Sequence, residues 1–173
     1  WTEEGSRRFL LGADDQGRDV LSTIVFGARV SLLVGFCAVL FAMTVGITLG
    51  LVSGYVGGAV ESVIMRVADV QLTFPAILIA LVVDGVAKAS FGSALDVGPL
   101  IGLIVVSIGL SFWVQYARTV RSSVMVEKGK DYVQAARLIG LSPPVIMIRH
   151  VLPNVTGPVF VIATINLALA IIT

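Results

Sequence analysis

The side chains able to do chemistry are few and lie far apart in the sequence. Two aspartates open the stretch DDQGRD (14–19), which invites comparison with a calcium-binding loop. Because this stretch lacks the alternating ligands of an EF-hand loop, we predict a turn followed by an N-cap at Asp19 instead. His150 is the only histidine and has no cluster of Cys or carboxylate residues near it in the sequence. Neither place predicts a metal site or a catalytic site.

The sequence also contains no motif for nucleotide chemistry. A phosphate-binding loop of the form G-x-x-x-x-G-K-[ST] does not occur in the 173 residues, and we find no convincing pairing of a nucleophile with a base. We therefore expect that this chain is not an enzyme and binds no cofactor of its own. Its work is expected to be conformational.

The composition predicts an integral membrane protein. Hydrophobic residues make up 57% of the chain, charged residues make up 13%, and the mean hydropathy is +0.99. An average soluble domain is about 25% charged. The formal net charge of +1 gives no indication of a nucleic-acid partner. Cys37, the single cysteine, lies within an apolar run and is expected to be a small buried side chain.

Four apolar segments have the length needed to cross a membrane, which takes about 20 residues in a helix. They cover residues 29–53, 60–84 and 98–126, and the fourth starts near residue 155. The predicted fold class is therefore an all-α, polytopic bundle of transmembrane helices. We also expect further sequence at both ends, because the chain starts at Trp1 rather than Met and is still apolar at Thr173.

The distribution of basic residues predicts which loops face the cytoplasm. Residues 118–150 hold six Lys and Arg residues against two acidic ones, Glu127 and Asp131. The positive-inside rule therefore places the loop at residues 127–153 in the cytoplasm. Counting back through the spans puts the turn GYVGG (54–58) on the same side, with residues 85–97 and the N-terminal segment outside.

Small residues line one face of the first span. They recur at a spacing of four and are Ala38, Ala42, Gly46, Gly50 and Gly54. A face of this kind lets the backbone of a second helix come close. We interpret it as a helix-packing surface, and direct lining of a pore is the alternative.

The second span carries two charged residues and a proline. Arg66 and Asp69 lie three residues apart and are predicted to pair on one helix face, because an unpaired charge in lipid is costly. Pro75 removes a helical hydrogen bond and predicts a kink. The two charges form either a structural ion pair near the cytoplasmic end or part of a moving gate.

The third span has a polar stripe formed by Ser107, Ser111 and Gln115, again at a spacing of four. Hydrogen bonding between helices and lining of a polar path explain this stripe equally well. With the three residues of the second span, they are our candidates for translocation and gating.

The cytoplasmic loop is predicted to begin with a short amphipathic helix over residues 130–139. Its apolar face is formed by Tyr132, Ala135, Ala136 and Ile139. Gly140 suits the C′ position that ends such a helix. Because paired alanines are poor lipid anchors, this helix is predicted to fit a socket on a soluble partner. An interfacial helix pair that only anchors the bundle is the alternative.

A second helix is predicted in the same loop. Ser142 can cap it, and Pro143 suits its first position, where a missing N–H costs nothing. This helix is expected to run through VIMIRHVL and to end before Pro153.

The loop resembles the EAA loop of the permease subunits of bacterial ABC importers. That pattern is Glu-Ala-Ala, three residues, Gly, nine residues, and then an apolar residue, any residue, Leu and Pro. Here QAA (134–136) is followed at the same spacing by Gly140 and by HVLP (150–153). Two positions depart from the pattern, because Gln134 replaces the acidic residue and His150 replaces the apolar one.

Other segments narrow the resemblance to one branch of these permeases. The chain is similar to the second, C-type permease subunit of the dipeptide, oligopeptide and nickel branch in LGADDQGRDVLSTIVFGARVSLLVG (11–35), GYVGG (54–58), MRVADVQLTFP (65–75) and RHVLPN (149–154). The resemblance implies the type I permease fold, with one span before Trp1 and the rest of a fifth and a sixth span after Thr173. We expect an external segment at 1–28 and a transmembrane core at 29–173.

The resemblance also implies partners, substrates and functional residues. The partners are a second homologous permease, two cytoplasmic ATPases that hold ATP and Mg, a periplasmic or lipid-anchored binding protein, and the lipid of the bacterial inner membrane. The residues implied to couple the loop to an ATPase are Asp131, Tyr132, Gln134, Ala135, Ala136, Arg137, Gly140, Leu141 and Pro153. Peptides are the implied substrates, and nickel chelates or glutathione are the alternatives.

Two other classes of membrane protein remain as alternatives. A channel or secondary transporter would need charged residues near the middle of the bilayer, for which Asp69 is the main candidate. A membrane-embedded enzyme would need convergent acid, base or metal-binding residues within the spans, and we find none. Only the importer predicts two stoichiometric ATPases in the purified complex.

Overall fold

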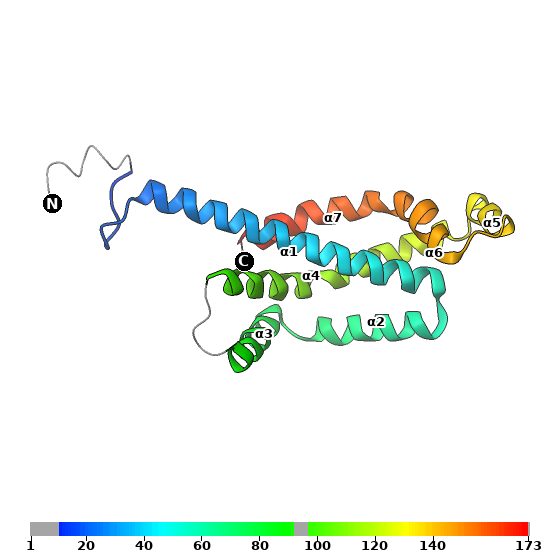
Figure 1. The fold of residues 1–173 in the computed structure, drawn as a ribbon, viewed down its shortest axis with the longest axis horizontal. Coiled ribbons are helices and arrows are strands. Elements are labelled where there is room, and N and C mark those ends of the chain that lie inside the picture. Colours follow the sequence, from blue (N-terminus) through cyan, green and yellow to red (C-terminus); the bar gives the residue numbers. More distant parts are fainter. Residues whose placement is uncertain (1–10, 92–96, 173) are drawn as a thin grey trace.

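The computed structural model describes residues 11–91 and 97–172, and these residues form a bundle of helices (Figure 1). The helices are α1 (Val20–Val56), α2 (Gly58–Thr73), α3 (Ala76–Phe91), α4 (Val97–Glu127), α5 (Asp131–Leu138), α6 (Pro143–Ile146) and α7 (Leu152–Ile172), with a π-helical segment, η2 (Met147–Val151), between α6 and α7. The predicted all-α class is confirmed.

Three helical stretches within the described ranges are long and apolar enough to cross a membrane. They are Val20–Val56, Gly98–Glu127 and Pro143–Ile172. The second of these agrees with the span predicted at residues 98–126. The first begins earlier than the predicted residue 29, because Asp19 caps α1 and its carboxylate accepts hydrogen bonds from the N–H groups of Leu21 and Ser22, each at 3.2 Å. The predicted N-cap at Asp19 is thus confirmed.

The residues before α1 form the predicted turn. The Asp14 carboxylate accepts hydrogen bonds from the backbone N–H groups of Gln16 at 2.9 Å and Arg18 at 2.8 Å. These bonds, the one from Arg18 above all, lower the pKa of Asp14 below its usual value. DDQGRD is therefore an ordered turn that leads into the α1 cap.

The segment predicted as a single span at residues 60–84 is two helices, α2 and α3, set at 98° to each other. The kink predicted at Pro75 is confirmed, and by length and composition the two helices together qualify as one bent span. Phe74 has φ −90° and ψ 129°, the extended conformation that a following proline favours. The Pro75 carbonyl then accepts the first hydrogen bonds of α3, from Leu78 and Ile79.

The last span passes through Pro153 instead of starting beyond it. Pro153 lies in the first turn of α7, directly after η2, and the helical stretch Pro143–Ile172 has no break. The prediction of a helix that ends before Pro153 is therefore wrong. The wider π-helical turn changes the backbone hydrogen-bond register just before the residue that lacks an N–H donor, so the chain stays helical.

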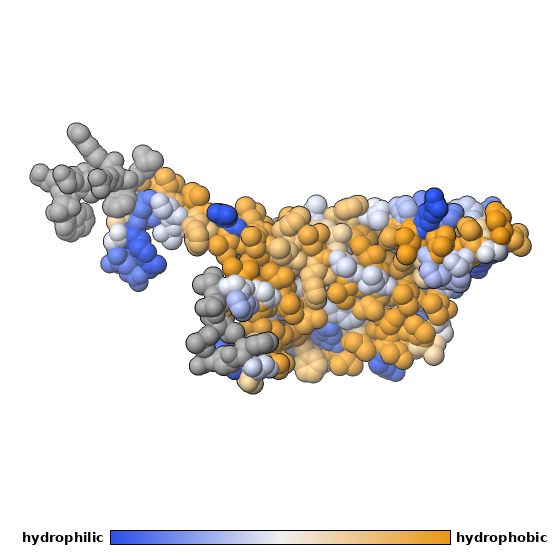
Figure 2. All heavy atoms as spheres, in the orientation of Figure 1, coloured by the Kyte–Doolittle hydropathy of each residue, from blue (hydrophilic) through white to orange (hydrophobic). Residues whose placement is uncertain are grey.

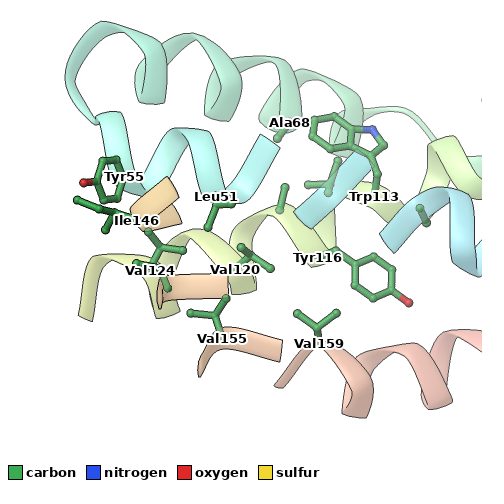
Figure 3. Packing of buried hydrophobic residues seen from close by; sticks show 14 of the residues in the cluster. Leu51, Tyr55, Ala68, Trp113, Tyr116, Val120, Val124, Ile146, Val155 and Val159 are labelled. Atoms are coloured by element: carbon green, nitrogen blue, oxygen red, sulfur yellow. The ribbon is translucent and has the colours of Figure 1, made fainter. Parts of the chain in front are cut away.

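The small-residue face of α1 packs directly on α4, and the predicted packing surface is confirmed. All five of its residues are buried. A methyl group at Gly50 would lie 2.6 Å from the carbonyl oxygen of Ala117 and 2.8 Å from the Cβ of Val120, so only glycine fits. Val120 and Val124 of α4, which lie next to Gly50 and Gly54, also belong to the buried cluster that includes Val155 and Val159 of α7 (Figure 3).

The two ends of the bundle differ in character. Helix α5 lies at the end where α1 passes into α2, whereas α1 and α4 both start at the opposite end (Figure 1). The Lys128 ammonium, just after α4, donates a 2.5 Å hydrogen bond to the Tyr55 carbonyl at the end of α1. Apolar residues cover most of the visible body, and hydrophilic residues gather around α5 and on the N-terminal turn (Figure 2). Residues 54–58 and 127–153 thus share one side, as the alternation of spans predicts.

Candidate functional site

Helix α5 is a short, well-terminated helix at the end of the bundle. Gly140 has φ +86°, which favours glycine. The Gly140 N–H donates to the Arg137 carbonyl at 3.0 Å and the Leu141 N–H donates to the Ala136 carbonyl at 3.2 Å. These two bonds form a Schellman motif, so the predicted C′ position of Gly140 is confirmed. Ser142 occupies the predicted N-cap position of α6, but its side chain makes no capping bond.

A hydrogen-bond network fixes α5 to the ends of α4 and α7. The Glu127 carboxylate accepts from the Lys130 ammonium at 2.6 Å and from the Tyr132 hydroxyl. The Asn154 amide of α7 donates to the same hydroxyl at 3.2 Å and to the His150 carbonyl at 2.7 Å. Burial raises the pKa of Tyr132 to about 12, and its bond to the Glu127 carboxylate acts in the same direction.

This network was not predicted from the sequence, apart from Tyr132. Glu127 and Asn154 lie on different spans, and nothing in their local spacing links them to α5. A carboxylate at the end of an apolar span is nevertheless a signal in the sequence, because such a charge needs partners where it is buried. In the structure Glu127 is only 8% exposed.

The faces of α5 differ from the prediction. Val133 and Ala136 are buried against the bundle, whereas Ile139 is 78% exposed, so the apolar face predicted from Tyr132, Ala135, Ala136 and Ile139 is wrong. Ala136 therefore packs inward, while Ala135 is exposed. The helix has two apolar sides, and only the inner one is covered.

The exposed side of α5 forms a tip made of Leu138 and Ile139. Leu138 is 90% exposed and Ile139 is 78% exposed. Asp131, Gln134 and Leu141 are exposed as well, so most of the residues implied in coupling are accessible. We call Leu138 and Ile139 the α5 tip.

The charges of α2 pair with α4 instead of with each other. Asp69 forms an ion pair with Arg118, so the predicted pair between Arg66 and Asp69 is wrong. Arg66 is exposed and forms no ion pair with any residue in the described ranges. The prediction considered only α2, whereas α4 lies beside α2 and brings Arg118 within reach of Asp69.

A second ion pair joins the same helices. The Arg121 Nε donates to the Glu61 carboxylate at 2.7 Å, and a terminal guanidinium nitrogen donates to the same oxygen. Neither residue was predicted. The signal was available, since Glu61 lies near the start of α2, Arg121 lies near the end of α4 and the two carry opposite charges. The two pairs line a cleft of about 450 Å³ whose walls are Glu61, Ser62, Met65, Asp69, Arg118 and Arg121.

Neutral polar side chains form a further link between α2 and α4. The indole N–H of Trp113 donates to the Gln71 side-chain oxygen at 2.6 Å, and the Gln71 amide donates to the Leu110 carbonyl. Trp113 is buried. This tie lies close to the bend at Pro75 and was not predicted.

The predicted polar stripe on α4 does not join helices through its serines. The hydroxyl of Ser107 donates to the Leu103 carbonyl at 2.8 Å, and that of Ser111 donates to the Ser107 carbonyl at 3.0 Å, both within α4. Gln115 is exposed. Of the two explanations for this stripe, the one based on hydrogen bonds between helices is therefore wrong for the two serines.

Comparisons with known proteins agree with this arrangement. The profile of the family "Binding-protein-dependent transport system inner membrane component" matches residues 46–173. The chain is 41% identical to the "Dipeptide transport system permease protein DppC" of Escherichia coli (strain K12), and 37% identical to the "Di/tripeptide transport system permease protein DppC" of Pseudomonas aeruginosa (strain UCBPP-PA14). Each match covers 99% of this chain and 54% of the relative. The chain thus spans about half the length of the curated relatives it matches.

Proposed function

Because the chain belongs to the family of binding-protein-dependent transport system inner membrane components, we propose that it is one permease subunit of an ATP-driven importer of short peptides. Its relatives named as dipeptide and di/tripeptide permeases support the peptide class. Nickel chelates and glutathione are the alternative cargoes. The relatives come from bacteria, which supports a place in the bacterial inner membrane.

The proposed importer has four further components. A second homologous permease completes the translocation path, two cytoplasmic ATPases bind and hydrolyse ATP, and a binding protein outside delivers the substrate. ATP and Mg belong to the ATPases in this proposal. The present chain contributes the path and the coupling surface.

The observation that carries the proposal is the geometry of α5. An exposed apolar tip stands on a helix that is capped at Gly140 and is fixed to α4 and α7 through Glu127, Tyr132 and Asn154. A soluble ATPase that covers Leu138 and Ile139 would bury apolar surface that is otherwise exposed to water. Movement of that ATPase then shifts α5 together with the two spans.

The cleft between α2 and α4 is the proposed part of the translocation path in this chain. Asp69 lies in the wall of this cleft. Along the same path, outside the residues that line the cleft, we place Arg66, Pro75, Ser107, Ser111 and Gln115. Charged residues in a membrane span favour protein or water over lipid as their surroundings. The second permease would cover this side of the bundle.

Cysteine crosslinking tests the coupling surface. In a Cys37→Ser background, Ile139→Cys should crosslink to an ATPase in the assembled complex. Leu11→Cys is the matched control and should give no such product, because Leu11 is 60% exposed but lies at the end of the bundle opposite to α5 (Figure 1). Equal crosslinking at both positions, or crosslinking of Ile139→Cys only to lipid, would contradict the coupling role.

Stimulated ATP hydrolysis tests the substrate class. The complex should be reconstituted with its binding protein and assayed with dipeptides, longer peptides, glutathione and nickel chelates. We expect short peptides to raise the rate of ATP hydrolysis most. Stimulation by a nickel chelate or glutathione alone would replace the peptide assignment while leaving the importer assignment intact.

A further inference from the structure

A cleft with two cations opens where α1, α4, α5 and α6 meet. Its volume is about 570 Å³, and it is separate from the cleft between α2 and α4. Tyr55 and Ile146, which lie next to each other in Figure 3, are two of its lining residues. Val56 and Leu141 complete an apolar wall, and Lys128 and Arg137 supply the charges. No carboxylate is among its lining residues in the described part of the chain.

Both cations are held against the same aromatic ring. The Lys128 Nζ lies 5.6 Å and the Arg137 Cζ lies 5.3 Å from the centre of the Tyr55 ring, within the range of a cation–π contact. Tyr55 is only 8% exposed, so this contact gives the two charges a fixed platform. Arg137 therefore points back from α5 towards the bundle, away from the α5 tip.

The cations keep most of their hydrogen-bond donors free. Lys128 uses one N–H for the Tyr55 carbonyl and has three in total. Arg137 makes no hydrogen bond or ion pair with its side chain to any residue that the structure describes. By contrast, Lys130, two residues from Lys128, is paired with Glu127. The cleft thus presents two positive groups with free donors and no internal counter-charge.

The position of the cleft relative to the membrane follows from the length of α1. Arg29 is exposed towards one end of this helix, and Tyr55 lies at the other end. The helix between them is about 39 Å long at 1.5 Å per residue. A bilayer has a hydrocarbon core of about 30 Å and is about 40–45 Å thick with its headgroups. When Arg29 lies among the headgroups of one leaflet, Tyr55 and the cleft lie among those of the other.

We propose that this cleft binds the headgroup of an anionic phospholipid from the cytoplasmic leaflet. The phosphate would accept hydrogen bonds from Lys128 and Arg137, and the start of the acyl chains would lie against Val56 and Leu141. An acidic side chain of a soluble partner would meet the charges but would leave the apolar wall uncovered. A lipid matches both parts of the cleft. This inference depends on the membrane depth and not on the proposed coupling to an ATPase.

The test uses the complete permease complex, stripped of lipid and titrated with phosphatidylglycerol while bound lipid is counted by native mass spectrometry. Lys128→Gln should weaken phosphatidylglycerol binding about fivefold, the effect of one lysine near an anionic surface. Lys130→Gln is the matched control, because it removes the same charge outside the cleft, and should leave the affinity unchanged. Phosphatidylcholine should bind more weakly than phosphatidylglycerol to the wild type.

Each other outcome overturns the proposal. Equal losses in Lys128→Gln and Lys130→Gln would indicate general attraction to charge. Unchanged lipid binding with loss of the ATPase from Lys128→Gln would assign the cleft to that partner. Displacement of phosphatidylglycerol by an equal concentration of glycerol 3-phosphate would indicate a site for a soluble anion. If Lys128→Gln does not assemble, Lys128→Arg should bind phosphatidylglycerol as the wild type does, and a failure to do so also counts against the site.

Discussion

Replacing Gly50 by alanine should push α1 away from α4, whereas the same replacement at Gly102 should not. A Cβ at Gly50 would lie 2.6 Å from the Ala117 carbonyl oxygen and 2.8 Å from the Val120 Cβ, both closer than any ordinary contact. A Cβ at Gly102, on α4, would have no atom within 4 Å. The two variants therefore add the same methyl group to a helix with and without a neighbour.

The magnitude follows from two opposing effects. Alanine favours a helix over glycine by up to about 1 kcal/mol, and this gain is the same at both positions. Overpacking a tight contact costs about 1–3 kcal/mol. An ordinary contact of a Cβ starts near 3.4 Å, so the 2.6 Å approach to the Ala117 carbonyl oxygen would have to lengthen by about 0.8 Å. Because the helix-forming gain cancels in the comparison, Gly50→Ala should be about 1–3 kcal/mol less stable than Gly102→Ala.

Thermal unfolding of the purified complex in one detergent measures this difference. The Tm of Gly102→Ala should equal or exceed that of the wild type, and the Tm of Gly50→Ala should be lower than both. Equal Tm values for the two variants would refute the close approach of α1 to α4, and with it the interpretation of the small-residue face.

Three further predictions concern the cap, the ion pairs and the network at α5. Gly140→Ala should lower the stability by about 1 kcal/mol, because position 140 has φ +86°. Gly140→Asn should be closer to the wild type in Tm, because asparagine tolerates that conformation. Equal losses of Tm in the two variants would contradict the cap. Arg121→Gln, which leaves a partly buried Glu61 unpaired, should lower the Tm more than Arg118→Gln, whose pair is about half exposed, and the reverse order would contradict the depth assigned to the two pairs. Tyr132 holds its proton more tightly in the folded state, with a pKa of about 12 against about 10, so its contribution to stability is complete below pH 10 and is lost as the pH rises to 12. Tyr132→Phe should therefore reduce the fall in Tm at alkaline pH. An identical fall in the variant and the wild type would contradict the network.

Local signals in the sequence predicted the elements that depend on local chemistry. The span α4, the short helix α5 and the C′ glycine at position 140 follow from apolar runs, helical periodicity and the preference of glycine for positive φ. The spacing of four between the small residues of α1 also predicted that they are buried, because this spacing places them on one helix face. Pro75 predicted a bend, but nothing local fixes its angle at 98°.

Features that depend on neighbouring helices could not be predicted in this way. Asp69 has a basic residue three positions away, yet it pairs with Arg118 on another helix. Trp113 and Gln71 are joined across 42 positions in the sequence. The pair of alanines that includes Ala136 is typical of an exposed contact surface, but the packing of α5 against the bundle buries Ala136. In each case the tertiary arrangement selects one partner among several that the sequence allows.

The burial of Ala136 changes how α5 can act as a coupling element. A helix attached only by flexible loops would move on its own when a partner pushed its tip. Here Val133 and Ala136 are part of the main core, and the Tyr132 hydroxyl bonds to both Glu127 and Asn154, so α5 cannot move without the ends of α4 and α7. Tyr132→Phe loosens this link and leaves the α5 tip unchanged. If the proposed function holds, the variant should retain its ATPases but move less substrate for each ATP hydrolysed, while Ile139→Gln should lose the ATPases themselves. Unchanged transport per ATP in Tyr132→Phe would mean that the force reaches the spans by another route.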